Sequence, residues 1–233
     1  MIKIIPSNER HLSESDWLKT YWHFSFDHYY DPDNIHFGHL RVFNEDWIKP
    51  SGGFPMHPHR DMEIVTYVID GELEHRDNQG NSGLIRAGEV QRMTAGAGIV
   101  HSEYNASAEQ ECHLLQMWVI PDEKNLQPGW EQKQFTRKER KDTLLPIISG
   151  KGSDNDTLEI HQDATFYISS LSEGKTVNHT ANSGRKLYLF VIDGNLRIND
   201  RDMAAGDQAR ADSETEYAFS AVSPAEFLMI DLS

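Results

Sequence analysis

Short apolar runs, many of them alternating with polar residues, dominate this chain. β-Branched and aromatic residues gather in segments such as GLIRAGEVQRM, HLLQMWVI and EFLMIDL, with Gly, Asn and Asp between them. Runs of this length, bounded by turn-forming residues, are typical of β-strands, so we predict a mostly β fold. One helical stretch is expected around Glu14 to Trp22. The charged run RKERKD at 137–142 is expected to be a solvated surface, as a loop or a short helix.

Two β-rich halves of the chain contain similar short sequence motifs in the same order. YVIDGELEH begins at Tyr67 and FVIDGNLRI begins at Phe190, while AGE at 87–89 matches AGD at 205–207. An apolar strand closed by Asp-Gly is a common hairpin and can arise twice independently. The paired order and the similar offsets favour a duplication, and hence two similar β-barrels.

A polar stretch from Pro121 to about Thr157 separates these halves, and within it GKGSDND at 150–156 is typical of a linker or exposed loop. We therefore predict an all-β chain with two jelly-roll barrels and few short helices. The expected boundaries are 1–125 for an N-terminal barrel, 126–156 for a connecting segment and 157–233 for a C-terminal barrel.

The composition changes the list of expected partners. The chain is 38% hydrophobic and 25% charged, which is ordinary for a globular protein with a sizeable core. Its formal charge is −15, from 37 acidic and 22 basic residues. That charge disfavours binding to nucleic-acid phosphates or to anionic lipid, so we expect no direct nucleic-acid partner and no membrane partner.

Cysteine usage and the first residues bear on the compartment. Cys112 is the single cysteine, which excludes an intrachain disulfide and a thiolate-rich metal site. The start, MIKIIPSNERHL, is interrupted by Pro6 and lacks the apolar core of a signal peptide, and no run approaches the length of a membrane span. We expect a cytoplasmic protein, and a monomer.

Candidate metal ligands occur in two strand-like stretches, GGFPMHPHRDMEIVTYVIDG and AGAGIVHSEYN. Because side chains alternate along a strand, His57 and His59 share one face, and His101 and Glu103 share a face of another strand. Three imidazoles and one carboxylate suit one divalent transition metal; we expect Fe2+, with Cu2+, Ni2+, Mn2+ and Zn2+ as alternatives. Four protein ligands on a six-coordinate ion would leave two positions for a substrate, water or dioxygen.

Glu63 competes with Glu103 on the same argument. Asp61 and Glu63 continue the alternation of His57 and His59 if the strand stays regular, which would place Glu63 in the same cavity. It could complete the metal shell, orient a histidine or accept a proton from the substrate. The alternation of side chains along a strand does not distinguish these roles, so Glu103 and Glu63 are both candidate catalytic carboxylates.

The other conspicuous residues receive a structural interpretation. Gly71 is expected to close a hairpin, and Gly96 and Gly98 are expected to permit the turn before His101. Lone histidines are usually hydrogen-bonded core or surface residues, and a cluster of aromatic residues usually forms a core or a lid. This applies to His11, His36, His39, His75, His113, His161, His179, Trp17, Trp22, Phe24, Phe26, Tyr29 and Tyr30.

These motifs resemble the cupin superfamily, and the wider pattern resembles the pirin family within it. HPHRDME has the H-x-H-x3-E spacing of the first cupin motif, and GIVHSEYN has the G-x2-H-x3-N tail of the second. The likeness to pirins also includes WHFSFDHYYDP, FGHLRVFNED, VQRMTAGAGIVHSEYN and HLLQMWVIP, and it covers nearly all of residues 17–121. Gly96 stands at the proline position of the second cupin motif, a departure that looks pirin-like.

The resemblance implies a bicupin with one metal in the N-terminal barrel, bound by His57, His59, His101 and Glu103 rather than Glu63. It also implies a quercetin 2,3-dioxygenase, which opens a flavonol ring with O2 and releases CO. The flavonol would be a small aromatic chelating substrate whose hydroxyl proton passes to Glu103 or Glu63.

The alternative is a non-enzymatic regulatory or redox-sensing metalloprotein that binds transcription-related or metabolic proteins. A third hypothesis is that the metal only stabilises the barrel.

The C-terminal half lacks a comparable ligand set. Counted from the matching hairpins, the equivalents of His57, His59 and His101 are Thr180, Asn182 and Phe219. His179 lies one place off this register. We therefore predict that the second barrel binds no metal.

Overall fold

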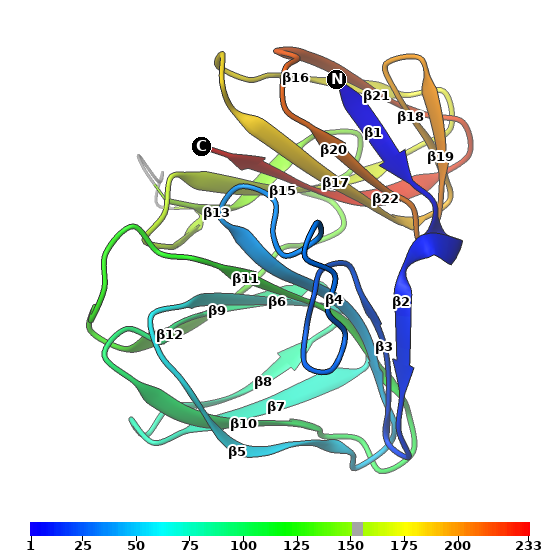
Figure 1. The fold of residues 1–233 in the computed structure, drawn as a ribbon. Coiled ribbons are helices and arrows are strands. Elements are labelled where there is room, and N and C mark those ends of the chain that lie inside the picture. Colours follow the sequence, from blue (N-terminus) through cyan, green and yellow to red (C-terminus); the bar gives the residue numbers. More distant parts are fainter. Residues whose placement is uncertain (151–155) are drawn as a thin grey trace. The chain divides into compact units, whose positions relative to one another are not determined.

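The computed structural model describes residues 1–150 and 156–233, which form two compact units (Figure 1). The N-terminal unit comprises His11–Gln134 and Leu158–Gln162, and the C-terminal unit comprises Met1–Arg10, Phe135–Thr157 and Asp163–Ser233. The predicted exposed loop at 150–156 falls almost wholly outside the described residues.

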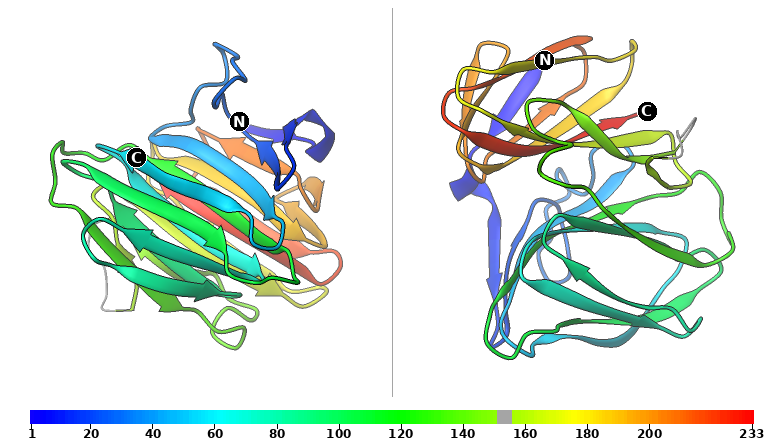
Figure 2. Two further views of the ribbon diagram at one scale, coloured as in Figure 1. Left: turned by 90° about the horizontal axis from the view of Figure 1, so that it is seen from below. Right: turned by 180° about the vertical axis from the view of Figure 1, so that it is seen from behind.

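The N-terminal unit consists of two antiparallel sheets that face each other (Figure 2). The seven-stranded sheet has the order β12-β9-β6-β11-β4-β3-β2, and the four-stranded sheet has the order β5-β10-β7-β8. The strands are β2 (His11–Glu14), β3 (Leu18–Trp22), β4 (Leu40–Ile48), β5 (Gly53–His59), β6 (Glu63–Asp70), β7 (Glu72–Asp77), β8 (Ser82–Arg86), β9 (Glu89–Thr94), β10 (Ile99–Asn105), β11 (Cys112–Val119) and β12 (Gly129–Gln134), with β14 (Leu158–Glu159) in the returning segment.

The C-terminal unit repeats this two-sheet plan. One of its sheets contains the run β1-β20-β17-β22-β15-β13, and the other has the order β16-β21-β18-β19. Its elements are β1 (Ile2–Ile5), the 3-10 helix η1 (Ser7–Glu9), β13 (Leu145–Ser149), β15 (Ala164–Leu171), β16 (Thr176–Thr180), β17 (Lys186–Asp193), β18 (Asn195–Ile198), β19 (Arg201–Ala204), β20 (Gln208–Ala211), β21 (Glu216–Ala221) and β22 (Ala225–Leu232). The all-β expectation with few short helices is confirmed, and each unit is a jelly-roll-like sandwich rather than a closed barrel.

The observed units differ from the predicted boundaries at three places. Strand β1 pairs with β20, so the first residues belong to the C-terminal unit. Strand β12 lies in the expected connecting segment but pairs with β9 along its whole length. Leu158–Gln162 returns to the N-terminal unit, where the Gln162 amide donates to the Ile120 carbonyl at 2.8 Å. Such pairings join residues far apart in the chain, and a local pattern does not reveal them.

Two local predictions have different outcomes. The helix expected around Glu14 to Trp22 is wrong, because β2 and β3 pair there as a hairpin. The run at 137–142 forms turns with mostly exposed side chains, as expected. Arg140 is the exception, since it is 4% exposed and forms an ion pair with Glu226 at 3.1 Å.

The repeated motifs occupy equivalent places in the two units, which supports a duplication. Gly71 joins β6 to β7 with a φ of +77°, and Gly194 joins β17 to β18 with a φ of +78°. A side chain at Gly194 would also meet the Pro224 carbonyl oxygen at 1.9 Å. Glycine is therefore required at this turn by both its backbone angle and its space.

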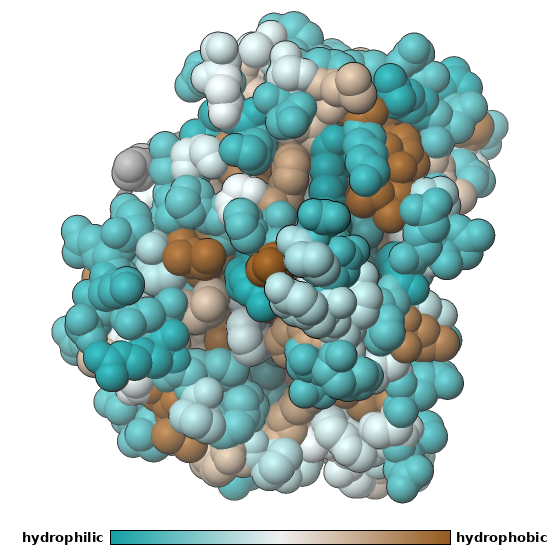
Figure 3. All heavy atoms as spheres, in the orientation of Figure 1, coloured by the Kyte–Doolittle hydropathy of each residue, from teal (hydrophilic) through white to brown (hydrophobic). Residues whose placement is uncertain are grey.

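Polar side chains dominate the face of the molecule seen in Figure 3, in keeping with the formal charge of −15. The exposed large apolar residues are scattered: Met1, Leu12, Tyr30, Met56, Tyr104, Ile120 and Val222. Within the described part of the chain, no helix has the length and hydropathy needed to span a membrane.

Cys112 gives a direct test of the packing of the N-terminal unit. It is fully buried against Val68, Leu73 and Leu114, and burial raises the pKa of its thiol to about 12. Thiolates rather than thiols attack disulfide reagents. We expect a disulfide reagent at pH 8 to modify the native protein roughly 1000-fold more slowly than an ordinary cysteine. Full modification is expected in guanidinium chloride, and equally fast modification without denaturant would contradict this packing.

Candidate metal centre

Three histidines meet where β5 and β10 pair in the four-stranded sheet. His101 lies directly opposite His57, and His59 lies opposite Ile99. The ring centroids are separated by 4.4 Å for His57 and His101, 4.7 Å for His57 and His59, and 4.9 Å for His59 and His101. One ring nitrogen from each histidine lies within 4.8 Å of the others. The structure therefore brings together the three histidines that alternation placed on two strands.

A chain of hydrogen bonds connects Asp77, His75 and His101. Asp77 Oδ2 lies 3.2 Å from His75 Nε2, and His75 Nδ1 lies 3.3 Å from His101 Nδ1. If Asp77 accepts from His75 Nε2–H, then His75 Nδ1 accepts from His101 Nδ1–H, and a lone pair is left on His101 Nε2. That Nε2 atom is buried and has no hydrogen-bond partner among the described residues. An unpartnered buried imidazole nitrogen is the donor that a divalent transition metal requires.

The protonation states agree with this assignment. Burial is the main cause that lowers the pKa of His59 to about 4 and that of His101 to about 3, and the neighbouring histidines lower both further. Burial opposes ionisation of Asp77, but hydrogen bonds from Asn81 and His75 outweigh it and lower its pKa. His59 and His101 are therefore neutral at pH 7, which is the form that ligates a metal.

His57 is oriented by its own strand. Its Nδ1 atom lies 2.7 Å from the Pro55 carbonyl oxygen, which can only accept, so Nδ1 carries the proton. In the neutral form of the ring, which is the form that ligates a metal, the lone pair is then on Nε2. His57 and His59 are both partly exposed, whereas His101 is 1% exposed. The three imidazoles thus form a candidate cation site, with the buried ring of His101 at its inner end.

Glu103 follows His101 on β10 after an irregularity in the pairing with β5. Both of its carboxylate oxygens accept hydrogen bonds: Oε1 from the Gln91 amide at 2.6 Å and Oε2 from the Gln116 amide at 2.7 Å. Glu103 is 2% exposed. The two amides hold the carboxylate in one place, and each oxygen keeps a lone pair for a further partner.

Two tryptophans orient these amides. Trp130 Nε1 donates to Gln91 Oε1 at 2.8 Å, and Trp118 Nε1 donates to Gln116 Oε1 at 3.1 Å. Since an indole N–H can only donate, each glutamine must turn its NH2 group toward Glu103. Gln91 and Gln116 lie in one row across the sheet, on either side of Thr66 in the strand register.

His75 is the functional neighbour that sequence reasoning missed. We interpreted it as an ordinary structural histidine, but it is fully buried, contacts His101 and forms a second close group with His101 and Glu103. Its ring also stacks on Trp130 at 5.2 Å. The available signal was the alternation of Leu73, His75 and Asp77 along β7, which places two polar residues on the apolar face of the strand.

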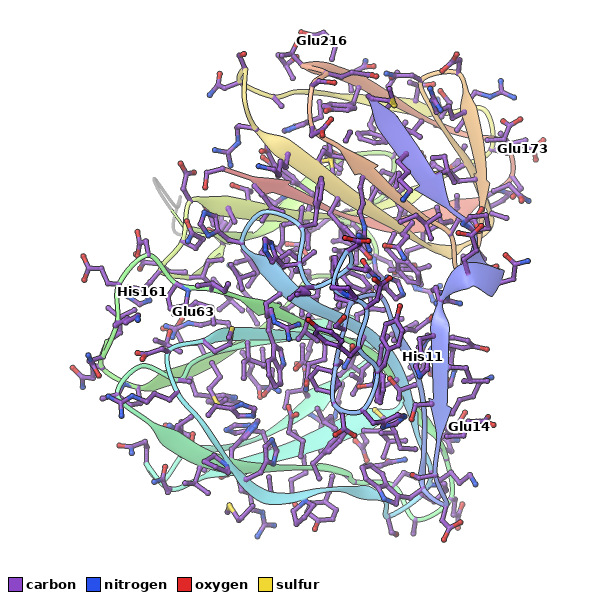
Figure 4. All side chains as sticks on the ribbon, in the orientation of Figure 1. His11, Glu14, Glu63, His161, Glu173 and Glu216 are labelled. Atoms are coloured by element: carbon purple, nitrogen blue, oxygen red, sulfur yellow. The ribbon has the colours of Figure 1, made fainter. Side chains whose placement is uncertain are left out.

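Glu63 does not lie with the histidines. Asp61 has a φ of +49°, which breaks the strand, and Glu63 begins β6 in the seven-stranded sheet. Its carboxylate accepts from Thr94 Oγ1 at 2.9 Å and contacts His161 Nδ1 at 3.3 Å. Figure 4 labels Glu63 and His161 near each other. We expected Glu63 in the cavity only if the strand that carries His57 and His59 continued regularly to Glu63, and it does not. Burial raises the pKa of Glu63 despite these hydrogen bonds.

A cavity of about 650 Å³ opens beside the histidines, within the N-terminal unit. His57, His59 and Glu103 line it, and aromatic rings form much of its wall. Trp22 contacts Phe26, Phe26 contacts Trp118, and Trp118 contacts His59, at centroid distances of 5.4, 5.4 and 4.9 Å. The other lining residues are Ser13, Glu14, Ser15, Trp17, Leu18, Thr20, Asp27, His28, Asn44, Asp46, Phe54 and Gln116.

The aromatic residues near the N-terminus divide between core and lid, as expected. Phe24 is buried, Trp17, Trp22 and Phe26 line the cavity, and Tyr30 is 73% exposed. Several of the remaining histidines have structural partners: His11 stacks on Tyr29, His113 bonds Glu45, His161 contacts Glu63 and His179 bonds Asp231.

Asp46 is an unexpected member of the cavity wall. It is 2% exposed and lies opposite Thr20 in the pairing of β3 with β4. Burial raises its pKa to about 7; Thr20 opposes this effect, while the carboxylates of Glu103 and Glu45 add to it. The sequence contained no motif that singled it out.

Strand pairing shows where the predicted equivalents lie in the C-terminal unit. Phe219 lies opposite Val177 and Tyr217 lies opposite His179, as His101 lies opposite His57 and Ile99 opposite His59. Thr180 pairs with Glu216 and therefore does not face Phe219. His179 bonds Asp231 at 2.7 Å, and Phe219 belongs to the apolar core. The absence of a metal from this unit stays a prediction.

Comparisons with known proteins point in one direction. Residues 6–119 match the family described as Pirin, and residues 146–232 match the quercetinase C-terminal cupin domain. The chain is 38% identical over 232 residues to quercetin 2,3-dioxygenase of Escherichia coli K12, covering 100% of this chain and 99% of that one. It is 39% identical over 231 residues to a pirin-like protein of Caulobacter vibrioides, covering 99% of each. The structure of bacterial pirin YhhW from Escherichia coli in complex with nickel(II) matches with a TM-score of 0.94 at 38% identity, covering 100% of this chain and 99% of that one.

Proposed function

This chain belongs to the pirin family of the cupin superfamily, and on that premise we propose that its N-terminal unit is a metal-dependent dioxygenase of the quercetin 2,3-dioxygenase type. The proposed ligands of one divalent transition metal are His57, His59, His101 and Glu103. Iron(II) is the metal we favour, and nickel(II), the ion bound by the related YhhW, is an alternative.

The observation that carries this proposal is the position of the unpartnered His101 Nε2 beside an aromatic-walled cavity. His57 and His59 supply two further imidazoles, and Glu103 supplies a fixed carboxylate that lines the same cavity. Three nitrogens and one oxygen form a donor set that suits a divalent transition metal. The residues present therefore fit the cofactor that the family implies.

The proposed reaction converts one flavonol and one O2 into a depside and CO. When bound, the cation would act as a Lewis acid toward the 3-hydroxyl and 4-carbonyl oxygens of the flavonol and would supply the redox chemistry that dioxygen needs. The rings of Trp22, Phe26 and Trp118 provide apolar walls that suit a flat substrate and exclude water. Glu103 is the carboxylate we propose to accept the proton of the 3-hydroxyl.

The test is an oxygen-consumption assay on protein purified anaerobically and reconstituted with iron(II). We expect quercetin and oxygen to be consumed in equal amounts with release of CO. His57→Ala should retain less than about 1% of this activity, since changes that only reorient a ligand already weaken metal sites by roughly 10–100-fold. Iron-containing wild-type protein that consumes neither quercetin nor oxygen would reject the proposal and would favour the regulatory, non-enzymatic alternative.

A further inference from the structure

One wall of the cavity presents buried hydrogen-bond acceptors that retain acceptor capacity. Asp46 is 2% exposed, lines the cavity, and its Oδ1 atom has no hydrogen-bond partner among the described residues. Asn44 lies two positions earlier on the same face of β4, is 4% exposed and also has an Oδ1 atom without a partner there. The Thr20 hydroxyl, opposite Asp46 in the strand pairing, is the neighbouring donor for the Asp46 carboxylate. Buried polar atoms are almost always hydrogen-bonded, so the acceptor capacity that is left on Asp46 and Asn44 indicates further donors from outside the chain.

The charge of the cavity limits what can bring those donors. The described residues that line it include four carboxylates, Glu14, Asp27, Asp46 and Glu103, and include no lysine or arginine. An anionic aromatic ligand would meet like charges, whereas a neutral ligand with hydroxyl groups would meet acceptors. The chemistry that fits is therefore a flat aromatic molecule with O–H donors.

We propose that Asp46, together with Asn44, is a substrate-recognition point that accepts hydrogen bonds from hydroxyl groups of the aromatic ligand other than its metal-chelating pair. This inference rests on the proposed function for the identity of the ligand as a flavonol. With this recognition point, the cavity binds polyhydroxylated flavonols more tightly than flavonols that carry only the chelating 3-hydroxyl and 4-carbonyl groups. The raised pKa of Asp46 agrees with this role, because burial outweighs the hydrogen bond from Thr20 and leaves the ionised carboxylate poorly stabilised.

The experiment compares quercetin with 3-hydroxyflavone, which keeps the chelating pair but lacks the other hydroxyl groups. Dissociation constants are measured under nitrogen on the full-length, nickel-loaded protein from the quenching of tryptophan fluorescence, since Trp17, Trp22 and Trp118 line the cavity. At pH 8, where Asp46 with its pKa of about 7 is mostly ionised, we expect the wild-type protein to bind quercetin about 10- to 100-fold more tightly, the range for a hydrogen bond to a charged group. Asp46→Asn should reduce this preference at least about fivefold while leaving the nickel content unchanged.

A matched control comes from the adjacent position. Glu45 is also a buried carboxylate on β4, but it faces the other side of the sheet and bonds His113 at 3.1 Å. Glu45→Gln should keep the wild-type preference. Asn44→Ala, as a second variant, should reduce the preference less than Asp46→Asn, because it removes a neutral acceptor. Circular dichroism and nickel content confirm that each variant is folded.

Three outcomes decide the proposal. Loss of preference in Asp46→Asn with unchanged binding of 3-hydroxyflavone supports it. An unchanged preference, or an equal loss of affinity for both flavonols, overturns it, because Asp46 would then only shape the cavity. If wild-type protein binds neither flavonol, the proposed function fails, and the pair 2,7-dihydroxynaphthalene and naphthalene decides instead. A preference for the diol that Asp46→Asn abolishes supports the recognition point, and an equal affinity of wild-type protein for both overturns it.

Discussion

Replacement of His101 by alanine is expected to lower the bound metal from about one ion per chain to almost none. The change removes the one imidazole of the cluster that is fully buried and whose Nε2 atom has no partner in the described chain. It also leaves His75 Nδ1 without its neighbour at 3.3 Å. Metal content, measured by mass spectrometry after reconstitution and desalting, checks the prediction.

The control for this variant is His113→Ala. His113 lies on β11 of the same unit, but its ring stacks on Trp47 and bonds Glu45, away from the cluster. That variant should bind metal as the wild-type protein does. Stoichiometric metal in His101→Ala with normal affinity would show that the three histidines are not the site, and the proposed ligand set would have to be abandoned.

Gln116→Leu is expected to weaken metal affinity by about 10–100-fold, although Gln116 is not a proposed ligand. The leucine removes the amide that donates to Glu103 Oε2 at 2.7 Å and leaves Trp118 Nε1 without its acceptor. The Glu103 carboxylate would then be held on one side only, by Gln91. A competition titration with a chelator of known affinity measures the change.

Gln134→Leu serves as the matched substitution. Gln134 is exposed on β12, and its amide donates to the Ala87 carbonyl oxygen at 3.4 Å, away from Glu103. Its affinity for metal should equal that of the wild-type protein. A Gln116→Leu protein with undiminished affinity would mean that the amide fills space beside Glu103 without orienting it.

Strand alternation predicted the part of the site that depends on local sequence. His57 and His59 share a face because they are two residues apart on β5, and His101 meets them because β10 pairs with β5 in register. The same reasoning failed at Glu63, since a single residue with positive φ, Asp61, changed the strand and its sheet. Residues two positions apart share a face only as long as the strand between them is regular.

The residues that were missed belong to contacts made through space. His75 reaches His101 from β7, and Asp46 reaches the cavity from β4, so neither stands near a recognisable motif. The helix expected around Glu14 to Trp22 failed for a similar reason. Propensity in that stretch is weak, and the pairing of β3 with β4 decides its conformation.

Phe219 and Val177 face each other across two paired strands of the C-terminal unit, as His101 and His57 do in the N-terminal unit. Phe219 is buried in an apolar interior with residues such as Leu189 and Phe227, and Val177 packs against that interior, which stabilises the unit. If, as we predict, only the N-terminal unit binds metal, depletion of the metal would leave the C-terminal unit folded. The two units would then respond differently to the supply of metal, although they share one fold.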